Sequence, residues 1–258
     1  DAFYPAIDRS CQFKPIMDIQ ILIILAIVFV AAFIYSALGF GLGLIAMPLL
    51  ALFLDIKTVT PLVALIGVTS IFFVFAGSWK NTDFRNVWKM LLASVFGIPI
   101  GLYLLTGAGD TVMKVGLALM IIFFALFSLS GRIGFALRGT RFSFAAGFLS
   151  GILGSAYNMG GPPVVIYGTL KHWSPSQFRA TLNSFFFPIS AIVTCSHFIA
   201  GLMTKPVLSY FYYSIPVLVV AVFVGGKVNR TIPIERFQKV IHVLLLMIGF
   251  LLLVKTVM

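Results

Sequence analysis

Apolar residues fill this chain in about eight long blocks, and short segments between the blocks hold nearly all of the charged residues. A transmembrane helix needs about 20 predominantly apolar residues, which is the length of most of these blocks. The pattern predicts an all-α, polytopic membrane protein with about eight hydrophobic helices. The blocks cover residues 19–54, 59–79, 90–108, 115–130, 142–170, 180–203, 207–226 and 240–254.

Two blocks are too long for one simple crossing. The block 19–54 runs 36 residues without a charge, and a straight helix of that length would span about 54 Å against a hydrocarbon core of about 30 Å. Each long block contains a glycine-rich interruption, at residues 39–43 and 154–163, and Pro follows within it or soon after it. We therefore expect two broken helices, each ending in a short second helix.

The two interruptions resemble copies of one another. Superposing Pro48 on Pro163 gives an offset of 115, and Gly77 and Gly101 match Gly201 and Gly225 at an offset of 124. A repeated broken helix followed by plain helices is typical of secondary transporters. We expect an extramembrane segment at 1–17, membrane repeats at 18–131 and 142–258, and a basic cytoplasmic linker at 132–141 between them.

Composition and charge support this topology. With 60% apolar and 10% charged residues, the chain is no soluble domain, and its net charge of +11 does not make it a nucleic-acid-binding module. If each broken block crosses the membrane once, Lys and Arg divide 10 to 8 between the two sides; if each is a hairpin that returns to its starting side, they divide 12 to 6. Because cytoplasmic loops carry the excess of Lys and Arg, we expect hairpins, inverted repeats and both termini on the non-cytoplasmic side.

The two breaks predict a binding site. Non-helical backbone at membrane depth is tolerated where it is buried or lines a cavity, and the N-terminus of a half-helix attracts anions through its dipole and its free amides. An alternative is that the glycines only permit close helix packing. The candidate substrate-binding residues of the breaks are Gly41, Gly43, Pro48, Asn158, Gly160, Gly161 and Pro163.

Polar residues recur at helical spacing along block 180–203 and share one face. Arg179 and Asn183 are further candidates for substrate binding, and Ser190, Thr194 and His197 are candidates for lining the pathway. Arg179 could equally snorkel to the interface or neutralise a lipid phosphate. His197 fits a hydrogen-bonded packing residue as well as a proton relay.

Carboxylates are placed only near the predicted ends of the spans. Cation channels, divalent-metal transporters and most proton-driven pumps depend on intramembrane Asp or Glu, so the distribution favours a small anionic substrate. Only Cys11 and Cys195 are available, which excludes a disulfide framework and a thiolate metal cluster. We expect no metal, no cofactor and no nucleic-acid partner, with the lipid bilayer as surroundings; the sequence does not indicate an oligomeric state.

These motifs resemble the sulfite exporter (TauE/SafE) family of bacterial anion permeases. The resemblance covers residues 19–254 and rests on the two hairpins, at 39–48 and 154–163, and on the run from Arg179 to Asn183. It implies a transporter, and no enzyme, that exports sulfite or organosulfonates across the bacterial inner membrane. The sequence departs from the family's adjacent glycines in the first hairpin, because Phe40 and Leu42 separate its glycines.

Two other functions compete with transport. Ser155 in the second break and His197 could form the dyad of an intramembrane serine hydrolase. A membrane scaffold or assembly factor would need neither the polar face nor the paired breaks. Hydrogen-bonding distance between the two side chains would favour the hydrolase, and a cavity between the two breaks would favour the transporter.

Overall fold

The computed structural model describes residues 14–39, 41–76, 84–130, 141–228 and 234–258. Within these ranges the secondary structure is entirely helical, which confirms the predicted all-α class. The helices, in chain order, are α1 (Lys14–Leu38), α2 (Leu42–Ala51), α3 (Ile56–Ala76), α4 (Phe84–Gly107), α5 (Asp110–Ser130), α6 (Arg141–Tyr157), α7 (Gly161–Leu170), α8 (Pro175–Ile199), α9 (Lys205–Val228) and α10 (Ile234–Val257).

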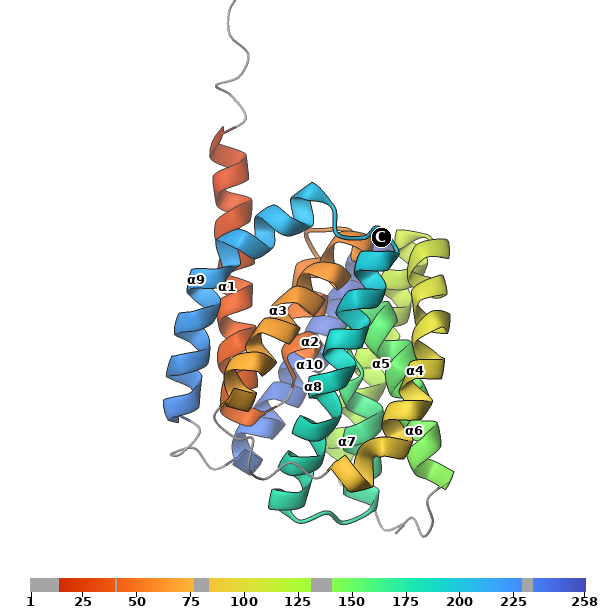
Figure 1. Cartoon of the computed structure of the whole chain (residues 1–258). Helices are drawn as coiled ribbons and strands as arrows, with labels where there is room; N and C mark the ends of the chain where they lie inside the picture. The colour runs from red at the N-terminus through yellow and green to blue at the C-terminus, as the bar shows by residue number, and fades with distance from the viewer. Residues whose placement is uncertain (1–13, 40, 77–83, 131–140, 229–233) are drawn as a thin grey trace, which may run out of the picture.

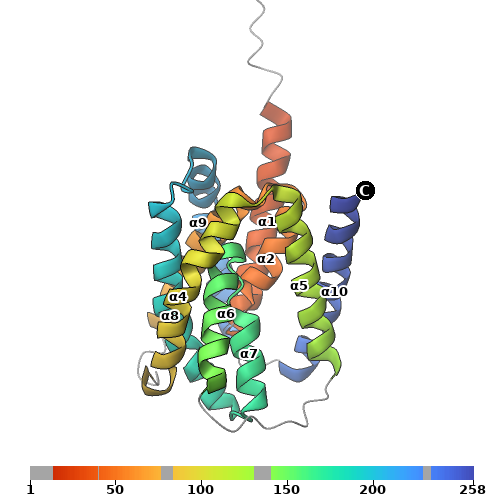
Figure 2. The ribbon, with the colours of Figure 1, turned by 90° about the vertical axis from the view of Figure 1, so that its right-hand side faces the viewer.

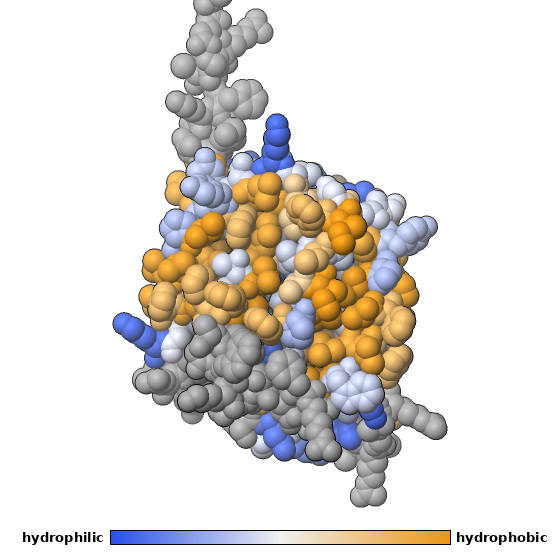
Figure 3. Space-filling view, in the orientation of Figure 1, coloured by the Kyte–Doolittle hydropathy of each residue, from blue (hydrophilic) through white to orange (hydrophobic). Residues whose placement is uncertain are grey.

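Each plain apolar block is one helix, and each long block is two. Six described helices are long and apolar enough to cross a membrane: α1, α3, α4, α5, α8 and α9. Apolar side chains form a broad band around the middle of the visible surface, with hydrophilic residues toward its two ends (Figure 3). The chain is therefore a multi-pass membrane protein, as the composition predicts.

The short helix of each broken block turns back beside the long one. In Figures 1 and 2, α1 begins and α10 ends at one end of the bundle, and α2 returns toward that end, whereas α7 returns toward the opposite end. Polar contacts join several chain segments at the end where α10 terminates. The Ile56 amide donates to Asp110 Oδ1 at 2.8 Å, and Lys255 Nζ donates to the Leu52 carbonyl at 2.6 Å.

Helix packing has the pairwise symmetry of two related halves. If α1 to α5 are exchanged with α6 to α10, the α1–α9 pair becomes α6–α4, and α3–α9 becomes α8–α4; all four are packed pairs. The pairs α5–α10 and α3–α8 map onto themselves and are also packed. This symmetry supports the predicted repeat. The domain limits remain a prediction, since most of 1–17 and nearly all of 132–141 lie outside the described residues.

Individual hydrogen bonds follow the same exchange. Ser36 Oγ of α1 donates to the Val222 carbonyl of α9 at 2.7 Å, and Ser155 Oγ of α6 donates to the Ile98 carbonyl of α4 at 2.9 Å. Ser155 follows Ser36 by 119 positions, and Val222 follows Ile98 by 124. The predicted offset of 124 therefore fits the later helices, but the offset of 115 for the breaks is wrong by about one helical turn.

The α4–α6 pair packs at backbone distance. A Cβ added at Gly97 or Gly101 of α4 would overlap backbone oxygens of α6, and one added at Gly147 or Gly151 of α6 would overlap those of α4. Small residues one turn apart permit this approach, as in other membrane bundles. Ser94 Oγ adds a hydrogen bond of 2.7 Å to the Gly147 carbonyl. The contact fixes α6, and hence the second break, in the bundle.

Candidate functional site

The two breaks share one backbone design. α1 ends at Leu38, and Gly39 follows with a φ of 83° while its amide donates to the Tyr35 carbonyl at 2.7 Å. α6 ends at Tyr157, and Asn158 follows with a φ of 52° while its amide donates to the Gly154 carbonyl at 2.8 Å. A residue in the left-handed region commonly ends a helix, and Asn is the usual substitute for Gly there.

Both short helices begin with a glycine before their first residue. Gly41 precedes α2 with a φ of 99°, which favours Gly, and Gly160 precedes α7. Pro162 lies at the start of α7, as predicted. Pro48 does not lie near the start of α2, because that helix already begins at Leu42; the structure pairs the two helix starts and not the two prolines.

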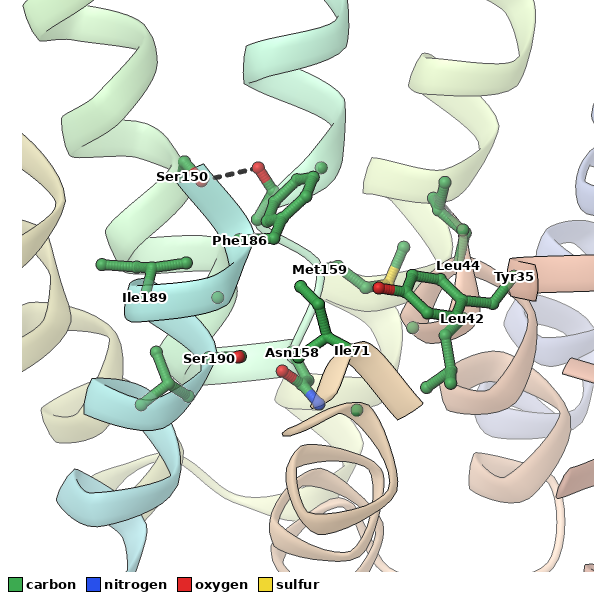
Figure 4. A pocket seen from close by; sticks show the side chains of 17 residues that line it. Tyr35, Leu42, Leu44, Ile71, Ser150, Asn158, Met159, Phe186, Ile189 and Ser190 are labelled. Atoms are coloured by element: carbon green, nitrogen blue, oxygen red, sulfur yellow. Dashed lines mark hydrogen bonds between the residues drawn. The ribbon is translucent and has the colours of Figure 1, made fainter. Parts of the chain in front are cut away.

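The two helix starts meet at one cavity of about 100 Å³. Since water occupies about 30 Å³ per molecule in the liquid, such a space accommodates a compact ion of a few heavy atoms. The breaks themselves are in close contact: a Cβ added at Gly43 would overlap the Asn158 carbonyl oxygen. The lining residues come from both halves (Figure 4): Tyr35, Gly41, Leu42, Gly43, Leu44, Gly67, Ile71, Ser150, Gly154, Asn158, Met159, Gly160, Gly161, Phe186, Ile189, Ser190 and Val193.

The cavity lies where the repeats meet. Gly67 and Ile71 of α3 line it, and so do their equivalents at the offset of 119, Phe186 and Ser190 of α8. Gly41 and Gly160 are related by the same offset. A site at a repeat interface is the general arrangement in secondary transporters built from repeats.

Polar groups in the cavity are few and uncharged. No Asp, Glu, Lys, Arg or His occurs among the described lining residues. Ser150 Oγ donates to the Gly160 carbonyl at 2.6 Å, the bond drawn in Figure 4, and Ser190 Oγ donates to the Phe187 carbonyl at 3.0 Å. The Tyr35 hydroxyl, the Asn158 side chain and the main-chain amides at the helix starts are the other groups that could contact a solute. Positive potential therefore comes from the two helix N-termini.

The predicted site residues divide into two groups. Gly41, Gly43, Asn158, Gly160, Gly161 and Ser190 line the cavity. Pro163 lines a different, outer groove, and Pro48 is buried within α2. Asn183 is half-buried on α8 away from the lining, and the Arg179 side chain lies outside what the structure describes. The substrate-binding roles of all these residues stay predictions.

Thr194 and His197 bond backbone carbonyls and do not line the cavity. Thr194 Oγ1 donates to the Ser190 carbonyl of its own helix at 2.8 Å and lies 3.4 Å from the Ala64 carbonyl of α3. His197 Nε2 lies 2.8 Å from the Ser155 carbonyl, in the last turn of α6, and Thr60 Oγ1 lies 3.3 Å from the neighbouring Ala156 carbonyl. Because α6 ends inside the bundle, His197 and Thr60 satisfy carbonyls that no further helical turn reaches.

The same contacts count against the hydrolase dyad. His197 contacts the carbonyl of Ser155, while the Ser155 hydroxyl donates to the Ile98 and Gly151 carbonyls, both at 2.9 Å. A serine nucleophile needs its hydroxyl hydrogen-bonded to the base. This pair lacks that arrangement.

Several residues that line the cavity are not among the predicted site residues. Tyr35 lies one turn before the first break, and its equivalent in the second repeat, Gly154, also lines the cavity. Phe186 lies one turn before Ser190 on α8, and Met159, for which its place in the second break favoured a packing role over contact with a sulfur-containing ligand, lines the cavity too. The interval from Tyr35 to Gly39 was the available signal, because a side chain in the last turn before a break lies beside it.

Fold and site together define a multi-pass helical membrane protein with an internal cavity between two broken helices, the class to which many secondary transporters belong. The sequence profile of the family described as sulfite exporter TauE/SafE matches residues 24–252. The chain belongs to this family of transporters. It is also similar to the probable sulfite/organosulfonate exporter TauE of Cupriavidus necator, with 22% identity over 220 residues that cover 83% of this chain and 84% of the relative. No solved structure matches the chain.

Proposed function

We propose that this protein exports a small sulfur-containing oxyanion, such as sulfite or an organosulfonate, and binds it in the cavity between α2 and α7. Membership of the sulfite exporter family supports the class of substrate, and so does the name of the Cupriavidus necator relative. The observation that carries the binding site is the meeting of two half-helix N-termini at one cavity.

The two helix starts contribute unequally to the site. The first residues of a helix have amides without intrahelical acceptors, and in α2 these belong to Leu42, Gly43 and Leu44. In α7 the second and third residues are Pro162 and Pro163, which have no N–H to donate. The main-chain donors to the anion therefore come mostly from α2, while α7 contributes Gly161 and its dipole.

Side chains complete the proposed pathway. The Asn158 side chain lines the cavity and can donate from its amide nitrogen to an oxyanion. Arg179, in the second turn of α8, would meet the anion as it enters, and Asn183 would follow one turn further along the helix. Ser190 lies at the cavity.

The membrane potential can drive export if the protein has the predicted orientation. We infer that the bacterial inner membrane holds the protein with its basic end, which includes Lys171 and Lys227, in the cytoplasm and both termini outside. The potential, negative inside, then favours anion export by about 2.3 kcal/mol per charge per 100 mV. Alkaline phosphatase fused after Met258 should be active in the periplasm, and an inactive fusion would reverse the orientation.

Anion flux from proteoliposomes tests the function. Wild type is compared with Asn158→Gly and Asn158→Asp for sulfite, sulfoacetate, thiosulfate and chloride, at imposed voltages of both signs. Both substitutes tolerate the left-handed backbone at a φ of 52°, so folding is matched between them. Glycine removes the whole side chain with its donor, whereas aspartate keeps the size of the side chain, removes the donor and adds a negative charge to the cavity.

We expect voltage-sensitive flux of a sulfur oxyanion in wild type. A hydrogen bond to a charged group is worth about 1.5–3 kcal/mol, so Asn158→Gly should weaken the apparent affinity roughly 10- to 100-fold. Asn158→Asp should abolish flux by repulsion. Undiminished flux in Asn158→Asp would exclude an anion at this position, and no flux of any tested anion in wild type would favour the scaffold.

A further inference from the structure

A second, larger groove lies on the outside of the bundle between α5, α6 and α7. Its volume is about 300 Å³, three times that of the central cavity. It faces the membrane, since Phe123, Phe142 and Leu149 on its walls are at least half exposed. Figure 2 views this side of the molecule. The lining is almost wholly apolar: Met120, Phe123, Phe124, Phe142, Ala145, Ala146, Leu149, Leu153, Pro162, Pro163, Ile166, Tyr167 and Leu170.

The repeat explains why this groove is unusual. α2 packs against α1, α3, α5 and α10, whereas its counterpart α7 packs extensively only with α6 among the described helices. At the offset of 119, four groove-lining residues of α7 correspond to four residues of α2 that the protein itself buries. The residues Pro163, Ile166, Tyr167 and Leu170 correspond to Leu44, Met47, Pro48 and Ala51. Tyr167 is buried, but Pro163, Ile166 and Leu170 are only partly buried, so the described residues cover the apolar side of α7 less completely than that of α2.

One end of the groove carries a positive charge. Lys171 follows the last residue of α7, and its Nζ lies 6.0 Å from the centre of the Tyr167 ring, which lines the groove. Trp173 packs edge-on against the same ring at 5.5 Å between centroids. Aromatic rings beside a lysine at the end of a helix are typical of the membrane interface, where lipid phosphates lie.

We propose that one bilayer lipid occupies this groove, with an acyl chain along α5, α6 and α7 and its phosphate against Lys171. The lipid supplies the packing that α7 does not receive from protein. Because the first residue of α7, Gly161, lines the central cavity while Pro163 lines the groove, the lipid braces the half-helix that forms one wall of the anion site. This consequence for transport rests on the proposed function; the lipid site itself does not.

Native mass spectrometry of the purified chain, titrated with phosphatidylglycerol or phosphatidylcholine, tests the site. Ala145→Trp fills the groove from an exposed position on α6, and Ala191→Trp is the matched control on the exposed face of α8, outside the groove. Leu149→Asn makes the wall polar with a side chain of similar branching and serves if Ala145→Trp does not fold. Lys171→Gln removes the charge.

We expect Ala145→Trp and Leu149→Asn to bind phosphatidylglycerol at least tenfold more weakly than wild type, and Ala191→Trp to match wild type. One lysine near a lipid headgroup contributes about fivefold in affinity, so Lys171→Gln should lose about that factor and the preference for phosphatidylglycerol. Wild-type affinity in both groove variants would overturn the lipid site. Wild-type affinity in Lys171→Gln would overturn the placement of the phosphate.

Measurements of sulfite flux distinguish the effect of the lipid on transport from the binding of the lipid itself. Sulfite flux in Ala145→Trp should fall severalfold below that in Ala191→Trp. Equal flux in the two variants, despite lost lipid, would overturn the brace and leave the lipid site standing. If wild type transports no anion at all, the proposed function fails while the lipid titrations remain valid.

Discussion

His197 is the residue for which structure and sequence suggest the most different roles. Its side chain is fully buried at 0% exposure, and Nε2 lies 2.8 Å from the Ser155 carbonyl at the inner end of α6. His197→Leu removes this donor at similar side-chain volume. If the histidine serves as a cap for the broken helix, the substitution should lower the free energy of unfolding. That loss of stability should come from the missing hydrogen bond and should not require proton transfer by the histidine.

The loss of stability expected in His197→Leu follows from the position of the Ser155 carbonyl. A buried acceptor left without a donor costs about 1–3 kcal/mol, although interhelical hydrogen bonds in membranes average only about 0.6 kcal/mol when the unfolded state finds other partners. The larger range applies because α6 ends at Tyr157 and has no following turn to supply a donor. At about 2–4 °C per kcal/mol for a domain of 150–250 residues, a 2 kcal/mol loss lowers Tm by about 4–8 °C.

Thermal unfolding in detergent measures this loss beside two comparison variants. His197→Gln keeps an amide donor and should recover at least half of the stability. Thr60→Val removes the longer bond, of 3.3 Å, to the Ala156 carbonyl and should cost less than His197→Leu. Wild-type Tm in His197→Leu would refute the capping role. A stable His197→Gln that loses sulfite flux, or its dependence on pH, would restore the proton relay.

Four further substitutions test the packing around the site. Gly43→Ala places a Cβ on the Asn158 carbonyl oxygen, so it should cost about 1–3 kcal/mol and alter the cavity, seen as a lower Tm and a changed ratio of sulfite to sulfoacetate flux. Gly151→Leu should separate α4 from α6 at a similar or larger cost, measured by the same unfolding assay. Ser36→Ala and Ser155→Ala remove equivalent interhelical bonds and should each cost about 0.6–1.7 kcal/mol, additively in the double variant; strong coupling between these two sites would contradict their independence.

The positions of the breaks could be predicted because backbone chemistry determines them. Glycine at positive φ marks the first break, at Gly39 and Gly41, and proline at a helix start marks the second, at Pro162; each is a local requirement that the sequence shows. The register between the repeats could not be predicted from the prolines. Pro48 lies within α2 and Pro162 at the start of α7, so proline has different positions in helices that are otherwise equivalent.

The equivalence of Gly39 and Asn158 was hidden for a related reason. Both residues have positive φ and donate to a carbonyl four residues earlier, but only glycine identifies such a position in a sequence. Asparagine adopts the left-handed region less often and has many other uses. Its side chain gives the second break a polar group that the first break lacks, which is why the repeat is symmetric in backbone and asymmetric in chemistry.

The polar face of α8 shows why such a pattern alone did not locate the cavity. A broken helix leaves carbonyls inside the membrane, where no water satisfies them, so neighbouring helices must supply donors. His197 is hydrogen-bonded to a backbone carbonyl in the last turn of α6, and Thr194 donates mainly to Ser190 of its own helix. The side of α8 that lines the cavity consists of Phe186, Ile189, Ser190 and Val193 and is mostly apolar. The cost of an unpaired carbonyl in a membrane is as great as the benefit of a polar contact to substrate. A polar face beside a broken helix therefore predicts side chains that cap its carbonyls at least as strongly as it predicts a substrate pathway. The distance from each polar side chain to the end of the broken helix distinguishes the two roles.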